Sequence, residues 1–512
     1  MSRPHPARIA LAALLALLAG CASLEGGGHL DAHLASESAA VRACAAWYRA
    51  LDEAVEAAGV RDAQYAQLPG FPYFRVDRLL ASLRGRAAAS EPALQAFAER
   101  LLELDLESRR HEIENLAPRE FASLPEMRAD FARGAALLRT RECGRLLREI
   151  DLAKPETRAG ILESARVPDD YSLASRVLGL YPLSRIVFAD GSRRWEAESR
   201  AAFGGELQAP AEAALVRYAP PRSLSQPMTR AAAAGILGRA ELDPLGQPLL
   251  SERELAGIAA LYAPSFEIAV TGDYDRFGQL RWTRGSSVPE VDSTATAVYV
   301  LRAFTRYRDQ ILLQLVYTIW FSERPPSVEG DLLAGRLDGL VWRVTLAPDG
   351  EPLLYDSIHP CGCYHQFFPT PRARPRPAPD ALEEWAFVPQ ALPRVAEDER
   401  PVVRLASRTH YIERVSLVRG GDSVARYVFQ EYDALRSLAQ PEGGRRSAFG
   451  PDGIVAGTER AERLLFWPMG IRSAGAMRQW GRHATAFVGR RHFDDADLIE
   501  RRFELDLAER AP

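Results

Sequence analysis

Two histidines and two cysteines occupy alternate positions between His359 and His365, in the stretch IHPCGCYHQ. Cys361 and Cys363 stand between the histidines, separated only by Gly362. Thiolates combined with imidazoles suit Zn(II) or Cu(I), whereas two cysteines in an oxidising compartment can close a disulfide. Three interpretations are therefore open: a disulfide, a metal site, or four side chains with no shared role.

A straight strand would keep the four side chains too far apart for one ion. If residues 359–365 were extended, the outer histidines would be about 20 Å apart, whereas bonds to zinc are about 2.0 to 2.3 Å long. A metal site therefore requires a bend. Pro360 and Gly362 favour a bend, because proline fixes φ and glycine permits a positive φ. Asp356, in the strand expected just before the window, would then orient a ligand.

The N-terminus carries the most specific signal in the chain. Basic Arg3 and Arg8 lead into an apolar run, Ile9 to Ala19, and the sequence Leu-Ala-Gly follows up to Cys21. This pattern resembles the lipobox of bacterial lipoproteins. The resemblance implies that residues 1–20 are a signal peptide and that acyl chains such as palmitate are attached to Cys21. The apolar run is too short to cross a bilayer of about 30 Å, so lipid would be the anchor.

The lipobox also predicts where the mature protein resides. Ala22, rather than aspartate, follows the cysteine, and in Gram-negative lipoproteins this implies the outer membrane. We therefore expect a lipid-anchored protein of the cell envelope that faces the periplasm, with residues 21–35 as a flexible tether. The net charge of −4 and the pI near 6.2 give no reason to expect nucleic acid as a partner.

Export favours disulfides, because the periplasm is oxidising. Four cysteines remain once Cys21 is acylated, and they allow three pairings. Proximity favours Cys361 with Cys363 and leaves Cys44 to pair with Cys143. A bridge across about 100 residues would stabilise the fold by up to about 4.7 kcal/mol. Without that bridge, Cys44 and Cys143 would be small buried apolar residues of two helices.

Residues 36–205 have the apolar spacing of helices. In ESAAVRACAAWYRALDEAVEAAG, apolar residues recur every three or four positions until Gly59 ends the pattern. The segment FRVDRLLASLRGR, residues 74–86, and several later segments show similar spacing. These patterns predict an N-terminal all-helical domain.

Residues 210–512 change to the two-residue period of strands. We expect a hairpin over residues 265–283 and a central strand, apolar on both faces, at Ile311 to Phe321. Further strands are expected at 463–469 and 485–493, and helices near 252–262 and 431–438. A Pro/Arg-rich loop at 371–379 interrupts the pattern. The predicted class is α+β, with an antiparallel β-meander and segregated helices after the helical domain.

Several common chemistries are excluded by the sequence. Lys154 is the single lysine and it precedes a proline, which rules out a P-loop lysine and a Schiff-base lysine. No G-x-S-x-G elbow is present, and the motif that begins at His111 has Asn115 where a zinc protease requires its second histidine. The sequence assigns no catalytic residue. Asp356 and His483 would form an acid–base site only if the fold brought them to the cysteine loop.

The sequence therefore favours a lipid-anchored envelope protein of binding or assembly type, with membrane lipid and an unknown envelope protein or ligand as partners and no cofactor. The alternative is a periplasmic enzyme, metal-dependent or redox-active, that uses the loop residues His359, Cys361, Cys363 and His365. Zinc or copper would be its metal. A third possibility is that the same four residues sequester a metal without turnover.

Overall fold

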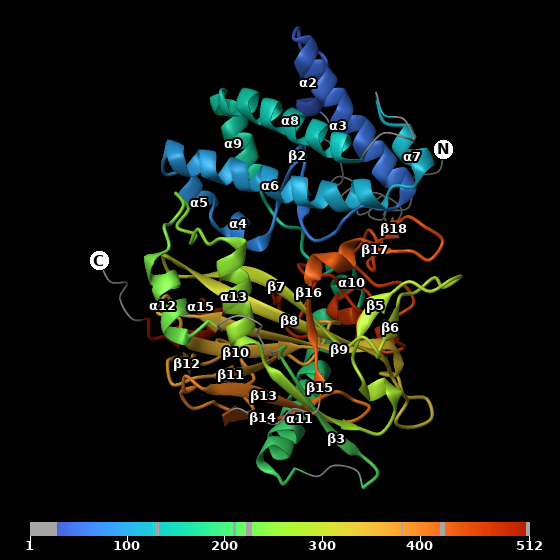
Figure 1. Cartoon of the computed structure of the whole chain (residues 1–512), viewed down its shortest axis with the longest axis vertical. Coiled ribbons are helices and arrows are strands. Elements are labelled where there is room, and N and C mark those ends of the chain that lie inside the picture. The colour runs from blue at the N-terminus through green and yellow to red at the C-terminus, as the bar shows by residue number, and fades with distance from the viewer. Residues whose placement is uncertain are drawn as a thin grey trace, which may run out of the picture.

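The computed structural model describes residues 28–125, 127, 133–207, 211–221, 228–380, 382–419 and 425–507. The predicted signal peptide, Cys21 and the first part of the tether lie outside these residues. The rest of the tether is not flexible as predicted, because Gly28–Leu34 form helix α2, which His29 and His33 hold to Asp151. Helix accounts for 36% and strand for 25% of the structure, with helices in the N-terminal region and antiparallel and mixed sheets in the C-terminal region. The predicted α+β class is therefore confirmed (Figure 1). None of the helices in the described part of the chain is long and apolar enough to cross a membrane.

The N-terminal helices lie together at one end of the longest axis and enclose one apolar core (Figure 1). Helix α3 ends at Gly59, whose φ of 64° gives the left-handed cap that the sequence indicated. Helix α6 begins after Ser90, whose side chain accepts a hydrogen bond from the backbone N–H of Ala93. The helices are α2 (Gly28–Leu34), α3 (Ala39–Ala58), α4 (Arg78–Ser82), α5 (Arg84–Ala87), α6 (Glu91–Asn115), α7 (Pro118–Ala122), α8 (Arg133–Leu152) and α9 (Pro155–Ser164).

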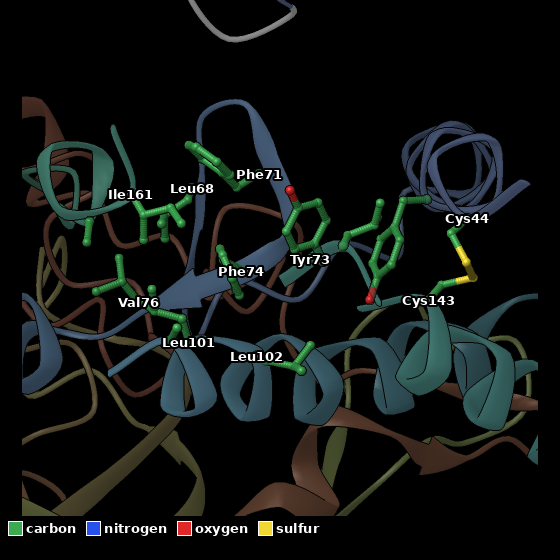
Figure 2. Close-up of a cluster of buried hydrophobic side chains, with 14 of the residues drawn as sticks. Cys44, Leu68, Phe71, Tyr73, Phe74, Val76, Leu101, Leu102, Cys143 and Ile161 are labelled. Atoms are coloured by element: carbon green, nitrogen blue, oxygen red, sulfur yellow. A yellow bond between two sulfur atoms is a disulfide. The ribbon is translucent and has the colours of Figure 1, made fainter. Parts of the chain in front are cut away.

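A two-stranded hairpin crosses this helical core, and it corrects one prediction. Strands β1 (Ala66–Leu68) and β2 (Phe71–Val76) pair antiparallel, so Phe74 to Val76 belong to a strand and not to the helix predicted over residues 74–86. All six residues of β2 are buried, and Figure 2 shows Phe71, Tyr73 and Phe74 packed among the helices. Burial on both faces removes the alternation that marks a strand in the sequence.

A six-stranded sheet forms the centre of the C-terminal part, in the order β11-β10-β9-β8-β7-β16. Strand β8 contains the predicted central strand at 311–321. Leu315 and Tyr317 enter one apolar core, whereas Val316 and Trp320 enter another on the opposite face, which confirms that both faces are covered. The strands are β7 (Ala297–Tyr307), β8 (Gln310–Arg324), β9 (Gly335–Leu346), β10 (Pro352–Ile358), β11 (Gln366–Pro369) and β16 (Val428–Glu431).

A second sheet has five strands in the order β14-β13-β4-β3-β15. The hairpin predicted over residues 265–283 is wrong, because β4 pairs with β3 and β13, whereas β5 (Gln279–Arg281) pairs with β6 (Glu290–Asp292). The carboxylate of Asp275 accepts hydrogen bonds from Thr271 and Arg408, and these bonds turn the chain away. The strands are β3 (Ala214–Ala219), β4 (Ser265–Val270), β13 (Glu399–Leu405), β14 (Ile412–Arg419) and β15 (Ala425–Arg426).

The remaining short elements include both confirmed and wrong predictions. Helix α13 (Glu252–Tyr262) has the expected position, because Ser251 and Glu254 form a capping box at its start. The helix expected near 431–438 is a 3₁₀ helix, η2 (Tyr432–Arg436). The strand expected at 463–469 is wrong, since that segment forms α14 (Arg463–Phe466) and η3 (Trp467–Met469).

The last predicted strand and the Pro/Arg-rich loop also differ from expectation. The strand expected at 485–493 is wrong, since the chain makes only an isolated bridge there, between His492 and the preceding Ala484. Arg491 and Tyr171 take up the backbone groups that a strand partner would use. The loop at 371–379 contains β12 (Ala373–Pro375), which pairs with β19 (Phe503–Leu505). The final helix is α15 (Leu498–Arg502).

Helices α10 (Leu173–Leu178) and α11 (Tyr181–Gly204) do not join the N-terminal core. They pack against η3, and α11 also contacts β14 of the five-stranded sheet. Helix α11 lies toward the end of the molecule opposite α2 (Figure 1). The division of the chain into domains at 36–205 and 210–512 remains a prediction.

Candidate functional site

The HPCGCYH window is the turn between β10 and β11. The N–H of Gly362 donates to the carbonyl of His359 at 2.8 Å, and the N–H of His359 donates to the carbonyl of Cys363 at 3.0 Å. Gly362 has a φ of 90°, and a Cβ at this position would stand 2.4 Å from the carbonyl oxygen of Ala484. The bend therefore forms where the sequence placed it, and only glycine fits there.

The two histidines of the window turn toward carboxylates of the sheet, not toward the sulfurs. Nδ1 of His359 lies 3.2 Å from Oδ1 of Asp338 on β9, and Nε2 of His365 lies 2.9 Å from Oδ2 of Asp356 on β10. Among the described residues, the window does not group its ligand atoms closely enough for one ion. The structure thus does not assemble the zinc or copper site of His359, Cys361, Cys363 and His365, because the register of β9 and β10 supplies each imidazole with an aspartate.

The two cysteines of the window do not form the disulfide that the sequence favours. Within the described residues, Cys361 and Cys363 are buried free thiols. They interact by hydrogen bonds: the backbone N–H of Cys363 lies 3.4 Å from Sγ of Cys361, and the two side chains also hydrogen-bond. Tyr364, with a φ of 60°, completes the turn. The CGC turn therefore presents a dithiol, in place of the disulfide predicted there.

The thiols have unequal acidities. Burial raises the pKa of Cys361, but its hydrogen bond with Cys363 and the positive charge of Arg460 outweigh that effect and lower it. The pKa of Cys363 is raised well above its usual value by the hydrogen bond to Cys361 and by burial. Cys361 is therefore the more nucleophilic sulfur of the pair.

Asp338 on β9 anchors the turn through His359. It contacts His359, Nδ1 of His410 at 2.9 Å and Nη2 of Arg460 at 3.3 Å. Burial opposes its ionisation, but His359 and Arg460 lower the pKa of Asp338 well below its usual value. The ring of His410 stacks on Phe321, with the centroids 3.8 Å apart. This cluster is sealed from solvent and holds the turn in position.

The predicted acid–base pair, Asp356 and His483, is not assembled at a solvent-accessible site. Asp356 is fully buried and forms an ion pair with Arg343, whose Nε lies 2.9 Å from Oδ1. Burial and the positive charge of Arg478 lower the pKa of His483 to about 3. His365 and His483 both contact the ring of Phe493, at 5.2 and 6.4 Å between centroids. Both predicted groups belong to the packed interior.

A cavity of about 430 Å³ lies beside the CGC turn, between that turn, α11 and the C-terminal segment. Cys361, Cys363 and His365 line it, whereas Asp356 and His483 do not. Trp195 of α11 forms one wall, with its ring 5.3 Å from Tyr364. The other aromatic lining residues are Phe188, Tyr411, Trp385, Phe387, Phe466 and Phe487. The cavity is thus mainly apolar, with two thiols in its wall.

Few charged groups reach the cavity, and most of them are engaged. Glu384 accepts hydrogen bonds from the N–H groups of Phe487 and Val488, at 2.9 and 3.0 Å. Burial raises the pKa of Glu462 to about 7, which places a protonatable acid near the thiols. Arg194 also lines the cavity; 73% of its side chain is exposed, and its Nη2 lies 3.0 Å from Oδ2 of Asp190, one turn earlier on α11. A cation therefore stands at the mouth and a weak acid inside.

The cavity adjoins an exposed apolar surface, whose residues the sequence had assigned to the helical domain and to the strand expected at 463–469. Helices α10 and α11 contact η3, and Phe188 lies 5.4 Å from Phe466. In α11, Leu183, Ile186 and Val187 share one helix face, and Val187 also lines the cavity. We call this surface the apolar face; its residues are each at least 44% exposed and are Leu173, Val177, Leu178, Leu180, Leu183, Ile186, Val187, Leu464, Leu465 and Trp467.

Comparison with protein-family profiles, with curated proteins and with solved structures gave no match for this chain. The function must therefore be inferred from the side chains of the site. Two chemistries fit them. The apolar cavity can bind an apolar ligand, and the dithiol beside Glu462 can exchange with a disulfide.

Proposed function

We propose that this protein is a lipid-anchored binding protein of the cell envelope, attached to the outer membrane at Cys21, facing the periplasm. Its ligand is an anionic amphiphile with an acyl chain, which lies in the cavity beneath α11. The observation that carries the proposal is the aromatic cavity of about 430 Å³ with the exposed Arg194 at its mouth. Ligand sites of this size and apolar lining are the usual binding sites of small molecules.

The surroundings of the cavity support an amphiphilic ligand. An acyl chain would be buried against Trp195 and Phe387, whereas an anionic head group would pair with Arg194 in place of its exposed partner Asp190. Exposed apolar patches that adjoin a cavity commonly mark binding sites, and Val187 belongs both to the apolar face and to the cavity wall. Helix α2, which begins seven residues after Cys21, lies at the opposite end of the longest axis from α11 (Figure 1), so the cavity would open away from the membrane.

The binding experiment uses palmitate and the fluorescence of Trp195 and Trp385, which line the cavity. Gly191 lines it from α11, and a Cβ at that position meets nothing within 4 Å. A Gly191→Leu variant should therefore place a side chain at the mouth and abolish the fluorescence change. Gly134→Leu is the matched control, because Gly134 is also helical and open but lies in α8.

The head-group contact has its own test. An Arg194→Gln variant should weaken palmitate binding and leave binding of the uncharged alcohol of the same chain length unchanged. Arg193→Gln removes the neighbouring charge, which does not line the cavity, and should have no effect. Palmitate that fails to bind wild-type protein, or that binds Gly191→Leu as tightly, would overturn the proposal.

The anchor is tested separately by fractionation. The wild-type chain should sediment with outer membranes and carry acyl chains at Cys21 by intact mass. A Cys21→Ala variant should lose both properties, because no other lipid attachment is proposed. A variant that stays membrane-bound would contradict the lipid anchor without affecting the ligand test.

A second function is favoured by one observation, the free dithiol in the cavity wall. In this function Cys361 attacks a disulfide of a substrate, the substrate's leaving sulfur departs as a thiolate, and Glu462 can supply its proton. Cys363 then displaces the substrate's remaining sulfur and closes a Cys361–Cys363 disulfide, so that two electrons pass to the substrate. A Cys363→Ala variant should trap the mixed disulfide at Cys361, whereas failure to trap any adduct with oxidised glutathione would exclude this function.

A further inference from the structure

His29, His33 and Asp151 meet at one point on the outer side of the helical part. His29 and His33 stand four residues apart on α2, so both imidazoles leave the same face of that helix. Their Nε2 atoms lie 2.8 and 2.9 Å from the same oxygen, Oδ1 of Asp151 near the end of α8. The three ligand atoms all lie within 4.8 Å of one another.

Asp151 differs from the other buried carboxylates of this part. Asp105 and Glu112 are each paired with Arg75 and Arg109, as expected for buried charges. The side chain of Asp151 is fully buried, yet the contacts described for it are two imidazoles and the phenol of Tyr73. The two Nε2 atoms that face Oδ1 are also the atoms that would ligate a metal, and a bound divalent cation would place a positive charge directly beside the buried carboxylate.

From this geometry we propose that His29, His33 and Asp151 bind Zn²⁺. Two imidazole nitrogens and one carboxylate oxygen form a common three-ligand set for zinc. In a tetrahedral site with bonds of about 2.0 to 2.1 Å, ligand atoms are about 3.3 Å apart. The two Nε2–Oδ1 spacings of 2.8 and 2.9 Å would widen by about half an ångström to admit the ion, while the two Nε2 atoms, which lie within 4.8 Å of each other, would settle at the same separation.

The surroundings are suited to orient the ligands and leave one position open. The hydroxyl of Tyr73 donates to Oδ2 of Asp151, the oxygen that the histidines do not contact, and in Figure 2 that hydroxyl points away from α6, which carries Leu101 and Leu102. His33 and Asp151 are buried, whereas 23% of the His29 side chain is exposed. Solvent can therefore provide the fourth ligand, on the side of His29.

The site would also fasten the start of the folded protein. Helix α2 contacts α3 and β2, and His29 stands eight positions after Cys21. A bound ion would join α2 to α8, and so attach the segment next to the lipid anchor to the helical core. This inference does not depend on the ligand proposed for the cavity.

The test is titration of the full chain in detergent, freed of metal with a chelator, with Zn²⁺ as the only added ion. Wild-type protein should bind one equivalent, and elemental analysis should recover it. His29→Gln and Asp151→Asn should each remove the bound ion, and Tyr73→Phe should weaken binding by about 10- to 100-fold. Thermal unfolding checks that each variant folds. Because His29 is partly exposed, His29→Gln should disturb the fold less than Asp151→Asn.

Two controls separate this site from other ligands. His492→Gln removes a histidine that also faces carboxylates, Asp169 and Asp170, and should leave binding unchanged. Cys361→Ser/Cys363→Ser should leave it unchanged too, and Co²⁺ in place of Zn²⁺ should show no thiolate charge-transfer band. Zn²⁺ should slow hydrogen exchange of α2 amides in the wild type and in these two controls, and should not do so in His29→Gln or Asp151→Asn. No stoichiometric binding, or full binding by His29→Gln, would show that the three residues only hydrogen-bond.

Discussion

The backbone N–H of Cys363 points at the sulfur of Cys361, with nitrogen and sulfur 3.4 Å apart. Together with the hydrogen bond between the side chains and the charge of Arg460, this contact favours the thiolate of Cys361. The turn therefore distinguishes two cysteines that the sequence presents as equivalent. Cys361 should carry the nucleophilic chemistry of the cavity wall.

Limited alkylation of the reduced protein tests this difference. Iodoacetamide should modify Cys361 first, since its pKa is lowered whereas that of Cys363 is raised. Peptide mapping by mass spectrometry gives both rates. Cys363→Ala removes the hydrogen-bonding thiol and should slow modification of Cys361 several-fold at neutral pH. Equal rates for the two cysteines would contradict the assignment.

The Cys44–Cys143 bridge should account for a large part of the stability of the helical part. The structure joins these residues, whose Cα atoms are 4.9 Å apart, across a sequence separation of 99 (Figure 2). Removing such a bridge costs about 2 to 5 kcal/mol, because the unfolded chain gains freedom. Urea unfolding of Cys44→Ala/Cys143→Ala should show this loss. Reductant should destabilise the wild type equally and leave that variant unaffected; a wild type insensitive to reductant would refute the bridge.

Replacing only one residue of the Arg343–Asp356 pair should strongly destabilise the folded protein. Both side chains are buried, and the guanidinium also donates to the carbonyl of Phe493. Arg343→Met leaves the carboxylate in the core with only His365 and should lower the free energy of unfolding by about 3 to 5 kcal/mol. Arg343→Met/Asp356→Leu should recover part of that loss, as chemical denaturation can measure. If the double variant were less stable than Arg343→Met, the unpaired carboxylate of Asp356 would not be the main cause of the destabilisation.

Stability should fall in acid because of buried imidazoles. Burial and the charge of Arg478 lower the pKa of His483 to about 3, whereas an unfolded histidine titrates near 6.5. The unfolded chain therefore binds an extra proton between these values. The contribution is fully present above about pH 6.5 and declines as the pH falls toward 3.

His483→Gln should make the free energy of unfolding less dependent on pH. Between pH 4 and 6 its slope should drop by about 1.4 kcal/mol per pH unit, the value for one proton. Thr485→Ser is the control, because it changes a side chain two residues away without removing a titratable group. It should keep the wild-type slope. The measurement is denaturant unfolding at several pH values. A His483→Gln slope equal to that of the wild type would mean that this histidine is charged in the folded protein.

The sequence predicts elements well where local rules and burial agree. Helix α13 begins at a capping box, and β8 combines β-branched and aromatic residues with two apolar faces. These predictions are wrong where tertiary contacts override the structure that the spacing of apolar residues indicates. Residues 74–76 are spaced like a helix but form the end of β2, because the helical core buries both faces of that strand. Leu464 and Leu465 suggested a strand but lie exposed on α14.

The candidate site was predictable only in its local geometry. Pro360 and Gly362 predicted the bend, and the bend forms. The partners of His359 and His365 depend on the register of β9 and β10, which one sequence does not reveal. The pair His29 and His33 had a visible signal, since four-residue spacing on a helix aligns two imidazoles. Its third member, Asp151, is more than a hundred residues away and could not be assigned.

The bridge between α3 and α8 has a mechanical consequence if the proposed lipid anchor holds the protein at its N-terminal end. A force applied between that end and the C-terminal sheets enters at α2 and α3, reaches Cys44, and crosses directly to Cys143. The residues between the two cysteines form a closed loop that carries no tension. Helix α6 and the β1–β2 hairpin can then fluctuate or unfold under load without lengthening the molecule, so the covalent bond limits its extension.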